Sequence, residues 1–134
     1  MATFNKFHSF VEALSEKVHN LGADTLTVAL SNTLPVNTNT VLANITQISY
    51  TNLSTRVLAG VTSAQTSGTY KLDANDLVLT ASGTVAQFRY VVLYNDTAAS
   101  DELIGWYDYG AAVDLLNGET FTITWDAAGI LTLA

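Results

Sequence analysis

Val85-Ala-Gln-Phe-Arg-Tyr-Val-Val-Leu-Tyr94 is the stretch of this sequence that decides the fold. Successive side chains of an extended strand point to opposite faces of its sheet. One face is then predicted to carry Ala86, Phe88, Tyr90, Val92 and Tyr94, and the other Gln87, Arg89, Val91 and Leu93. Because both faces are largely apolar in the second half, this strand is predicted to lie in the centre of a sheet.

Further strands are predicted on the C-terminal side of this stretch. Leu103 to Tyr109 reads as the next strand, after a polar loop from Asn95 to Asp101. Asn117-Gly118 is a strong signal for a tight turn. Threonines then alternate with Phe121, Ile123 and Trp125, and Ile130 to Leu133 reads as the last strand.

Toward the N-terminus the pattern also alternates, although less clearly. Short strands are predicted at Leu26–Leu30, Val57–Val61, Tyr70–Leu72 and Leu77–Thr80. Asn32–Thr40, which contains the only proline, Pro35, and Ser63–Gly68 are predicted to be loops. Val41–Tyr50 fits a short helix as well as a strand.

The first 21 residues carry a different period. Apolar side chains recur at steps of three and four residues, which is typical of one face of a helix: Phe4, Phe7, Val11, Leu14, Val18 and Leu21. Ser9 with Glu12 fits a capping box, and Gly22 fits a helix end. A helix over about residues 4–21 is therefore predicted, packed on its own sheet or docked on a neighbouring subunit.

Together these elements predict one domain, residues 1–134, with the helix first and strands over about 24–134. Some eight short strands separated by frequent turns are typical of an antiparallel fold. The predicted fold class is all-β: an antiparallel β-sandwich, jelly-roll-like, with one N-terminal α-helix. An immunoglobulin-like strand order remains open.

Composition limits the possible partners. Charged residues are 13% of the chain, about half the usual share, and a weakly charged surface resists association poorly. The net charge is −7, and beyond Lys17 the only cations are Arg56, Lys71 and Arg89. Because nucleic-acid binding needs cations to neutralise phosphates, no nucleic-acid partner is expected. Without a run of about 18 apolar residues or a signal peptide, no membrane association is expected either.

The residues do not combine into a recognisable catalytic or metal site. The chain has no cysteine, and its histidines, His8 and His19, are expected on the flanks of the helix. No GxSxG turn or HExxH pattern occurs. Asp101 and Glu102 are adjacent in a loop, and Asp73–Asp76 is read as a polar turn instead of a calcium loop. We therefore expect no enzyme activity, no metal and no cofactor.

Aromatic residues cluster at Trp106, Tyr107 and Tyr109. Exposed aromatic side chains can stack on sugars, and they also anchor protein interfaces. Trp106 and Trp125 could equally belong to the core. Among the exposed alternatives a protein interface is favoured, because depletion of charge accompanies it.

Several segments carry a resemblance to a known class of proteins. They are Phe4–Phe7 running into Phe10–Glu12, His19–Gly22, Phe88–Thr97, Leu103–Gly110, Gly118–Phe121 and Gly129–Leu131. In these segments the chain resembles small virion proteins of tailed bacteriophages, and in particular capsid decoration (cement) proteins. The resemblance covers most of the chain and is weakest across Asn32–Ser67.

The resemblance implies a role and a set of partners. The chain would bind the outer surface of a phage capsid, contact the major capsid protein and stabilise contacts between capsid subunits, as a dimer or trimer. The candidate contact elements are Asn32–Thr40, the edge of the helix and the strand with the aromatic cluster, with these residues: Phe4, Phe7, Pro35, Trp106, Tyr107 and Tyr109. Two alternatives stay open: another virion part, such as a tail or head-fibre component, and a carbohydrate-binding β-sandwich module.

Overall fold

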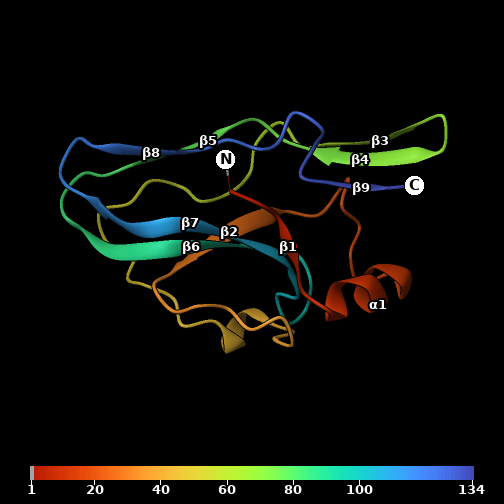
Figure 1. The fold of residues 1–134 in the computed structure, drawn as a ribbon, viewed down its shortest axis with the longest axis horizontal. Coiled ribbons are helices and arrows are strands. Elements are labelled where there is room, and N and C mark those ends of the chain that lie inside the picture. The colour runs from red at the N-terminus through yellow and green to blue at the C-terminus, as the bar shows by residue number, and fades with distance from the viewer. Residues whose placement is uncertain (1) are drawn as a thin grey trace.

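The strands of this protein form two layers, with a short helix at one end (Figure 1). The structure is a computed structural model that describes residues 2–134. Its elements are β1 (Asn5–Lys6), α1 (Ser9–Ser15), β2 (Leu26–Ser31), the 3₁₀ turn η1 (Leu42–Asn44), β3 (Thr62–Thr66), β4 (Thr69–Asp73), β5 (Leu77–Thr80), β6 (Val85–Asn95), β7 (Leu103–Leu115), β8 (Thr120–Ile123) and β9 (Leu131–Leu133). No helix among them is long and apolar enough to cross a membrane.

One layer is a four-stranded sheet in the order β1-β7-β6-β2. The other layer consists of two smaller sheets, β3-β4-β9 and β5-β8. All of these pairings are antiparallel. The predicted all-β antiparallel sandwich with an N-terminal helix is therefore confirmed.

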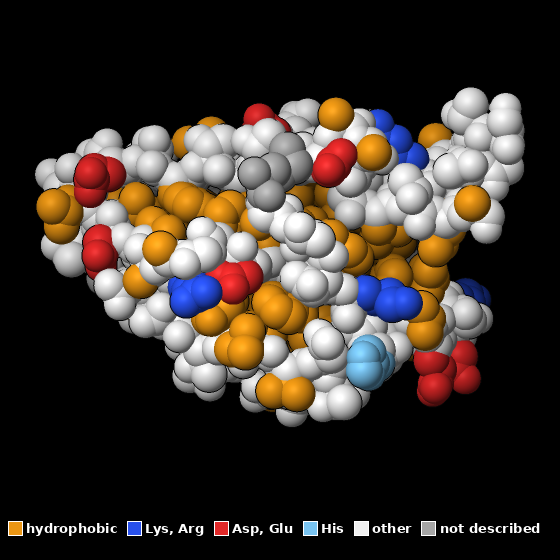
Figure 2. Space-filling model, in the orientation of Figure 1, with side chains coloured by type: hydrophobic (Ala, Val, Ile, Leu, Met, Phe, Trp, Pro, Cys, Tyr) orange, Lys and Arg blue, Asp and Glu red, His pale blue; other side chains and the backbone are white. Residues whose placement is uncertain are grey.

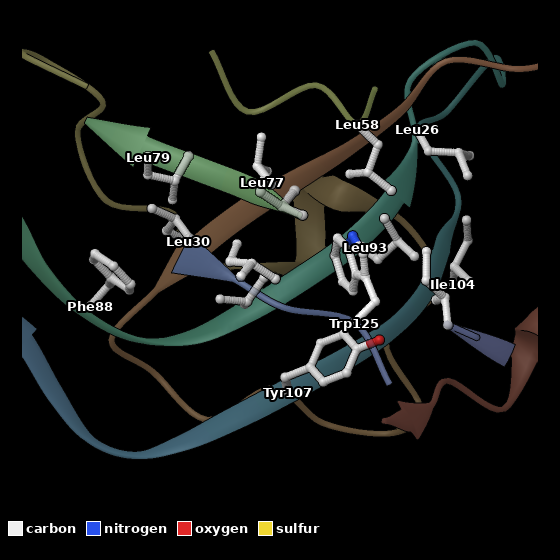
Figure 3. Close-up of a cluster of buried hydrophobic side chains, with 14 of the residues drawn as sticks. Leu26, Leu30, Leu58, Leu77, Leu79, Phe88, Leu93, Ile104, Tyr107 and Trp125 are labelled. Atoms are coloured by element: carbon white, nitrogen blue, oxygen red, sulfur yellow. The ribbon is translucent and has the colours of Figure 1, made fainter. Parts of the chain in front are cut away.

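The main core fills the space between the two layers. β6 contributes Phe88 and Leu93, and β2 contributes Leu30. From the opposite layer, Leu79 of β5 and Trp125 after β8 point into the same cluster (Figure 3). The indole nitrogen of Trp125 donates a hydrogen bond to the Asn75 carbonyl at 2.9 Å, which satisfies the one polar atom of this buried ring.

A second core lies on the other face of the four-stranded sheet. Phe7, Val92 and Leu103 are fully buried there, under the irregular segment 32–50 that contains η1 (Figure 1). Ile45 from that segment belongs to the same cluster. β6 is therefore apolar on both faces because each face has its own cover, and its predicted central position is confirmed by its neighbours β7 and β2.

The predicted facing of β6 is wrong in its first half. Register shifts occur on either side of Phe88, and such irregularities interrupt the regular alternation of side chains along a strand. Phe88 consequently shares the main core with Val91 and Leu93, while Val92 and Tyr94 lie in the second core.

The helix is much shorter than the predicted 4–21. Asn5 and Lys6 pair with Trp106 and Gly105 as strand β1, and α1 covers only Ser9–Ser15. Phe7 and Phe10 belong to the two different cores. The apolar residues of the N-terminal segment are spaced three and four apart because the chain passes from one core to the other. This spacing resembles the apolar face of a helix although most of the segment is not helical.

Two predictions between β2 and β4 also fail. Val57 makes only an isolated bridge to Thr27, so Val57–Val61 is not a strand. Thr62–Thr66, predicted within a loop, is strand β3 and pairs with β4. All of its side chains are exposed, so no alternation of buried and exposed residues marks it, and backbone hydrogen bonds alone define it.

Candidate interaction surface

The six predicted interface residues divide between the core and the surface. Phe7, Pro35 and Tyr107 are buried, and Phe4, Trp106 and Tyr109 are partly exposed. Burial raises the pKa of both the Tyr107 and the Tyr109 hydroxyl, that of Tyr109 to about 12. The six do not form one patch, because neighbouring residues of β7 point to opposite faces of the sheet.

Phe4 and Tyr107 nevertheless meet at the edge of a hollow. Their rings are in edge-to-face contact, with centroids 5.8 Å apart, and both line a hollow of about 510 Å³ between the N-terminal segment and the C-terminal strand. The other apolar residues that line it are Ala2, Phe10, Val11, Ala128, Ile130, Leu131 and Leu133.

A second hollow, of about 570 Å³, continues on the other side of Leu133. Its walls come from Leu14 in α1, from Val18 in the segment after α1, and from the β3–β4 hairpin through Tyr70. We call the two hollows together the β9 groove, because Leu133 of β9 lines both. Figure 2 shows hydrophobic side chains exposed in this region, between the layer containing β9 and the helix.

The aromatic face of β7 lies outside the groove. The Trp106 ring packs edge-to-face on Tyr90, with centroids 6.2 Å apart, and its indole nitrogen donates to Asn37 Oδ1 at 3.1 Å. Arg89 donates two hydrogen bonds to Asp108, at 2.8 and 3.1 Å. These bonds hold the pKa of the Asp108 carboxyl below its ordinary value.

A buried polar cluster fastens the chain after α1 to the end of β6. Asn95 is fully buried, and its amide nitrogen lies 2.6 Å from Asp24 Oδ2 and 3.0 Å from His19 Nδ1. Its amide oxygen accepts from the backbone N–H groups of Thr97 and Ala98. No pattern in the sequence indicates this cluster, because His19 is predicted on a helix flank and Asn95 in a loop.

His19 lies beyond the end of α1, and only 5% of it is exposed. Its Nε2 atom and Glu102 Oε2 are buried without a hydrogen-bond partner in the described structure. Burial lowers the pKa of His19, and the nearby carboxylates of Glu102 and Asp24 oppose that change. Neutral His19 thus fits this site, and its role here is to hold the 16–24 segment against the sheet.

Residues 2–134 contain no group of three or more His, Cys, Asp or Glu side chains that could hold a metal ion. In the Asp73–Asp76 turn, Asp73 uses its carboxylate within the fold, with Lys71 Nζ at 3.3 Å and the Ala74 N–H at 2.9 Å. The polar turn predicted there fits these contacts.

No known protein family, curated protein or solved structure matches this chain. Among the described residues, the β9 groove is a largely apolar hollow at the surface, and it is the site on which the proposal that follows is built.

Proposed function

We propose that the protein is a virion structural protein that binds the outer surface of a phage capsid and stabilises contacts between capsid subunits. The observation that carries the proposal is the β9 groove, an apolar hollow that two parts of the chain line without closing it. An exposed apolar groove on a weakly charged protein is typical of a surface that another protein covers. The sequence resemblance to decoration proteins supports the same role.

The negative net charge of the chain favours binding to the outer face of the capsid shell. The net charge is −7, and repulsion between this acidic chain and packaged nucleic acid disfavours the inner face. In the described structure Arg89 and Lys71 are each engaged by an aspartate, at 2.8 and 3.3 Å, which reduces the cations available for phosphate further.

The stabilising mechanism is mass action. A protein that binds the assembled shell and not its free subunits adds its binding free energy to the assembly. Because many copies bind one shell, a modest interface in each copy is sufficient. No reacting group is required, so the proposal includes no enzyme activity and no cofactor.

Binding to purified capsids, followed by calorimetry of the particles, tests this role. We expect saturable binding and a higher melting temperature of the shell. Leu133→Asp, which places a charge in the groove on a side chain that is 45% exposed, should abolish both. Val78→Asp is the matched control, since Val78 is 50% exposed on β5, outside the groove. Intact binding by the Leu133 variant would show that the groove is not the contact.

The oligomeric state belongs to the proposal as well. A dimer or trimer would bridge several capsid subunits. Light scattering after gel filtration measures the molar mass of the protein in solution and so gives its oligomeric state. Imaging of labelled protein on intact particles separates the shell from other virion positions. If the label were confined to the tail or to the base of head fibres, the protein would be a tail or head-fibre component and not a decoration protein.

A carbohydrate-binding module is the second candidate, favoured by one observation on the face of β7. Partly exposed Trp106 lies on the same sheet as the hydrogen-bonded pair of Arg89 and Asp108, and aromatic rings beside planar polar groups are common in sugar sites. A glycan array with a Trp106→Ala control tests it. Saturable glycan binding that this substitution removes would favour the module over the capsid role.

A further inference from the structure

Residues 16–20, which follow α1, are held against the sheet by one side chain. His19 is 5% exposed, whereas the other four residues are exposed at the surface. The backbone hydrogen bonds of this stretch all stay within residues 12–24. Among residues 2–134, the contact of His19 Nδ1 with the Asn95 amide nitrogen at 3.0 Å is the only hydrogen bond that joins the stretch to a sheet. We call residues 16–20 the flap, because a single polar contact holds them in place.

The surroundings of Asn95 determine where His19 carries its proton. The Asn95 amide oxygen accepts the backbone N–H groups of Thr97 and Ala98, at 3.0 and 3.2 Å, so turning the amide round would lose both bonds. Its NH₂ group consequently faces His19 and Asp24. Because an amide NH₂ group only donates, His19 Nδ1 must accept, and the ring is neutral with its proton on Nε2.

A second proton on His19 would have no acceptor in this arrangement. It would be on Nδ1, opposite the Asn95 NH₂ group, and a contact between two donors would replace the hydrogen bond. Nε2 is already buried without a partner, and so is Oε2 of Glu102, with which His19 forms no ion pair in the described part of the chain. Because a buried charge without a hydrogen-bonded partner is unfavourable, protonated His19 is more stable in water than in this site.

The charged groups that face His19 offset this cost only in part. Burial lowers the pKa of His19, and the carboxylates of Glu102, just before β7, and of Asp24 oppose that change without cancelling it. α1 contributes the uncharged ring of Phe10, with ring centroids 5.3 Å apart, and β6 contributes the neutral Asn95. The other titratable groups that line the hollow beside His19 are Lys17 and Tyr70.

The flap has a defined boundary on each side. Lys17 has a φ of 68°, in the left-handed region that glycine usually occupies after a helix, so a change of backbone conformation there relieves strain. On the other side Leu21 is buried in the main core, and Asp24 has its own bond to Asn95 at 2.6 Å. A movement of His19 out of its site is therefore confined to the residues between Lys17 and Leu21.

We propose that the flap is a pH-operated switch: neutral His19 holds it on Asn95, and protonation of His19 in mild acid releases it. The inference goes beyond the proposed function, because the switch lies within this chain and needs no partner. Four residues of the flap line the second hollow of the β9 groove, namely Lys17, Val18, His19 and Asn20. Release of the flap removes part of that wall, so the shape of the hollow depends on pH.

Amide hydrogen exchange of the whole protein, followed by NMR at about pH 7.5 and about pH 5, measures the opening. The probe is the Val18 N–H, which donates to the Ala13 carbonyl at 2.9 Å while Lys17 keeps its left-handed conformation. Each rate is divided by the intrinsic exchange rate at the same pH. We expect the open population to rise several-fold on acidification, and by at most about thirtyfold, because one proton on a group with an ordinary pKa of about 6.5 drives it.

Three variants assign the response to His19. His19→Gln does not titrate and keeps a side-chain oxygen that can accept from Asn95, so its open population should be the same at both pH values. Glu102→Gln removes a charge that favours protonated His19, so opening should begin at lower pH. His8→Gln, which replaces an exposed histidine, is the matched control for the loss of an imidazole. Circular dichroism checks the folding of each variant.

Several results would overturn the inference. Nitrogen chemical shifts of the His19 ring identify the protonated nitrogen in the unaltered protein, and a proton on Nδ1 at neutral pH would contradict the arrangement. An opening at Val18 that does not depend on pH, or that responds in the same way in His19→Gln, would remove the role of His19. The N–H of Val91, fully buried in β6, reports global unfolding. If Val18 and Val91 shared one free energy of opening and one dependence on urea, the flap would open only when the whole protein unfolds.

Discussion

The Phe4 ring occupies the space where a β-carbon would stand on Gly105. Gly105 lies in β7, where it pairs with Lys6 of β1 on one side and with Leu93 of β6 on the other. A β-carbon built on Gly105 would overlap the far edge of the Phe4 ring. The absence of a side chain at Gly105 therefore lets the N-terminal segment close over the edge of the main core, against Tyr107.

Gly105→Ala should consequently destabilise the protein and displace the Phe4 ring. Forcing an extra methyl group into a packed site typically costs about 1–3 kcal/mol. Urea unfolding followed by circular dichroism measures the free energy of unfolding. The control is a double-mutant cycle with Phe4→Ala, in which removal of the ring should relieve most of the Gly105→Ala penalty. Additive effects would show that the two residues do not interact.

Asn95→Ala should destabilise the protein more than the small change in side-chain volume suggests. Asn95 is fully buried and bonds to His19, Asp24 and two backbone N–H groups. Each buried partner left unsatisfied costs about 1–3 kcal/mol, so the free energy of unfolding should fall by at least that amount. Asn32→Ala is the control, because Asn32 is exposed and its side-chain amide donates a hydrogen bond to Gln87, which is also exposed. An equal, small effect of both substitutions would contradict the prediction.

The strands were predictable from the sequence where burial alternates along the chain. β5 shows this pattern, with Leu77 and Leu79 buried and Val78 exposed, and β6 was recognised by its apolar second half. The bulges beside Phe88 were not predictable, because they depend on how β7 is paired opposite them. β3 was missed because pairing with β4, and no burial of side chains, defines it.

The candidate site was predictable only in part. The apolar pattern at the N-terminus predicts Phe4 as a contact residue, and Phe4 does line the β9 groove. Phe7 has the same character, but the turn of the chain between β1 and α1 buries it in the second core. The groove itself combines residues near the two ends of the sequence, and the sequence pattern contains no signal for which distant segments meet.

The stability of the protein should decrease as the pH falls below about 6.5, because of His19. Burial lowers the pKa of His19 in the folded state, so below the pKa of the unfolded chain the unfolded state binds a proton that the folded state does not. The free energy of unfolding therefore rises with pH across this range and levels off above it.

Thermal unfolding of the protein and of a His19→Gln variant between pH 5 and pH 8 measures this effect. The difference in slope between the two isolates His19 from carboxylates that titrate at lower pH. His8→Gln, which replaces an exposed histidine, is the matched control for the loss of an imidazole. A slope that is the same with and without His19 would contradict the assignment.

At the alkaline end, two tyrosines of β7 should destabilise the folded state. Burial raises the pKa of Tyr109 to about 12 and raises that of Tyr107 as well, whereas in the unfolded chain both ionise near pH 10. Above about pH 10 the unfolded state loses protons that the folded state retains, so the free energy of unfolding falls as the pH rises further.

Absorbance at 295 nm reports tyrosinate and follows this titration directly. We expect Tyr107→Phe and Tyr109→Phe each to remove one late-titrating group and to reduce the alkaline loss of stability. Tyr70→Phe serves as the control, because Tyr70 lies at the rim of the β9 groove, where its hydroxyl contacts Ser63 at 2.9 Å. Ionisation of Tyr109 near pH 10 in the folded protein would contradict the prediction, because it would show that the Tyr109 hydroxyl is not buried.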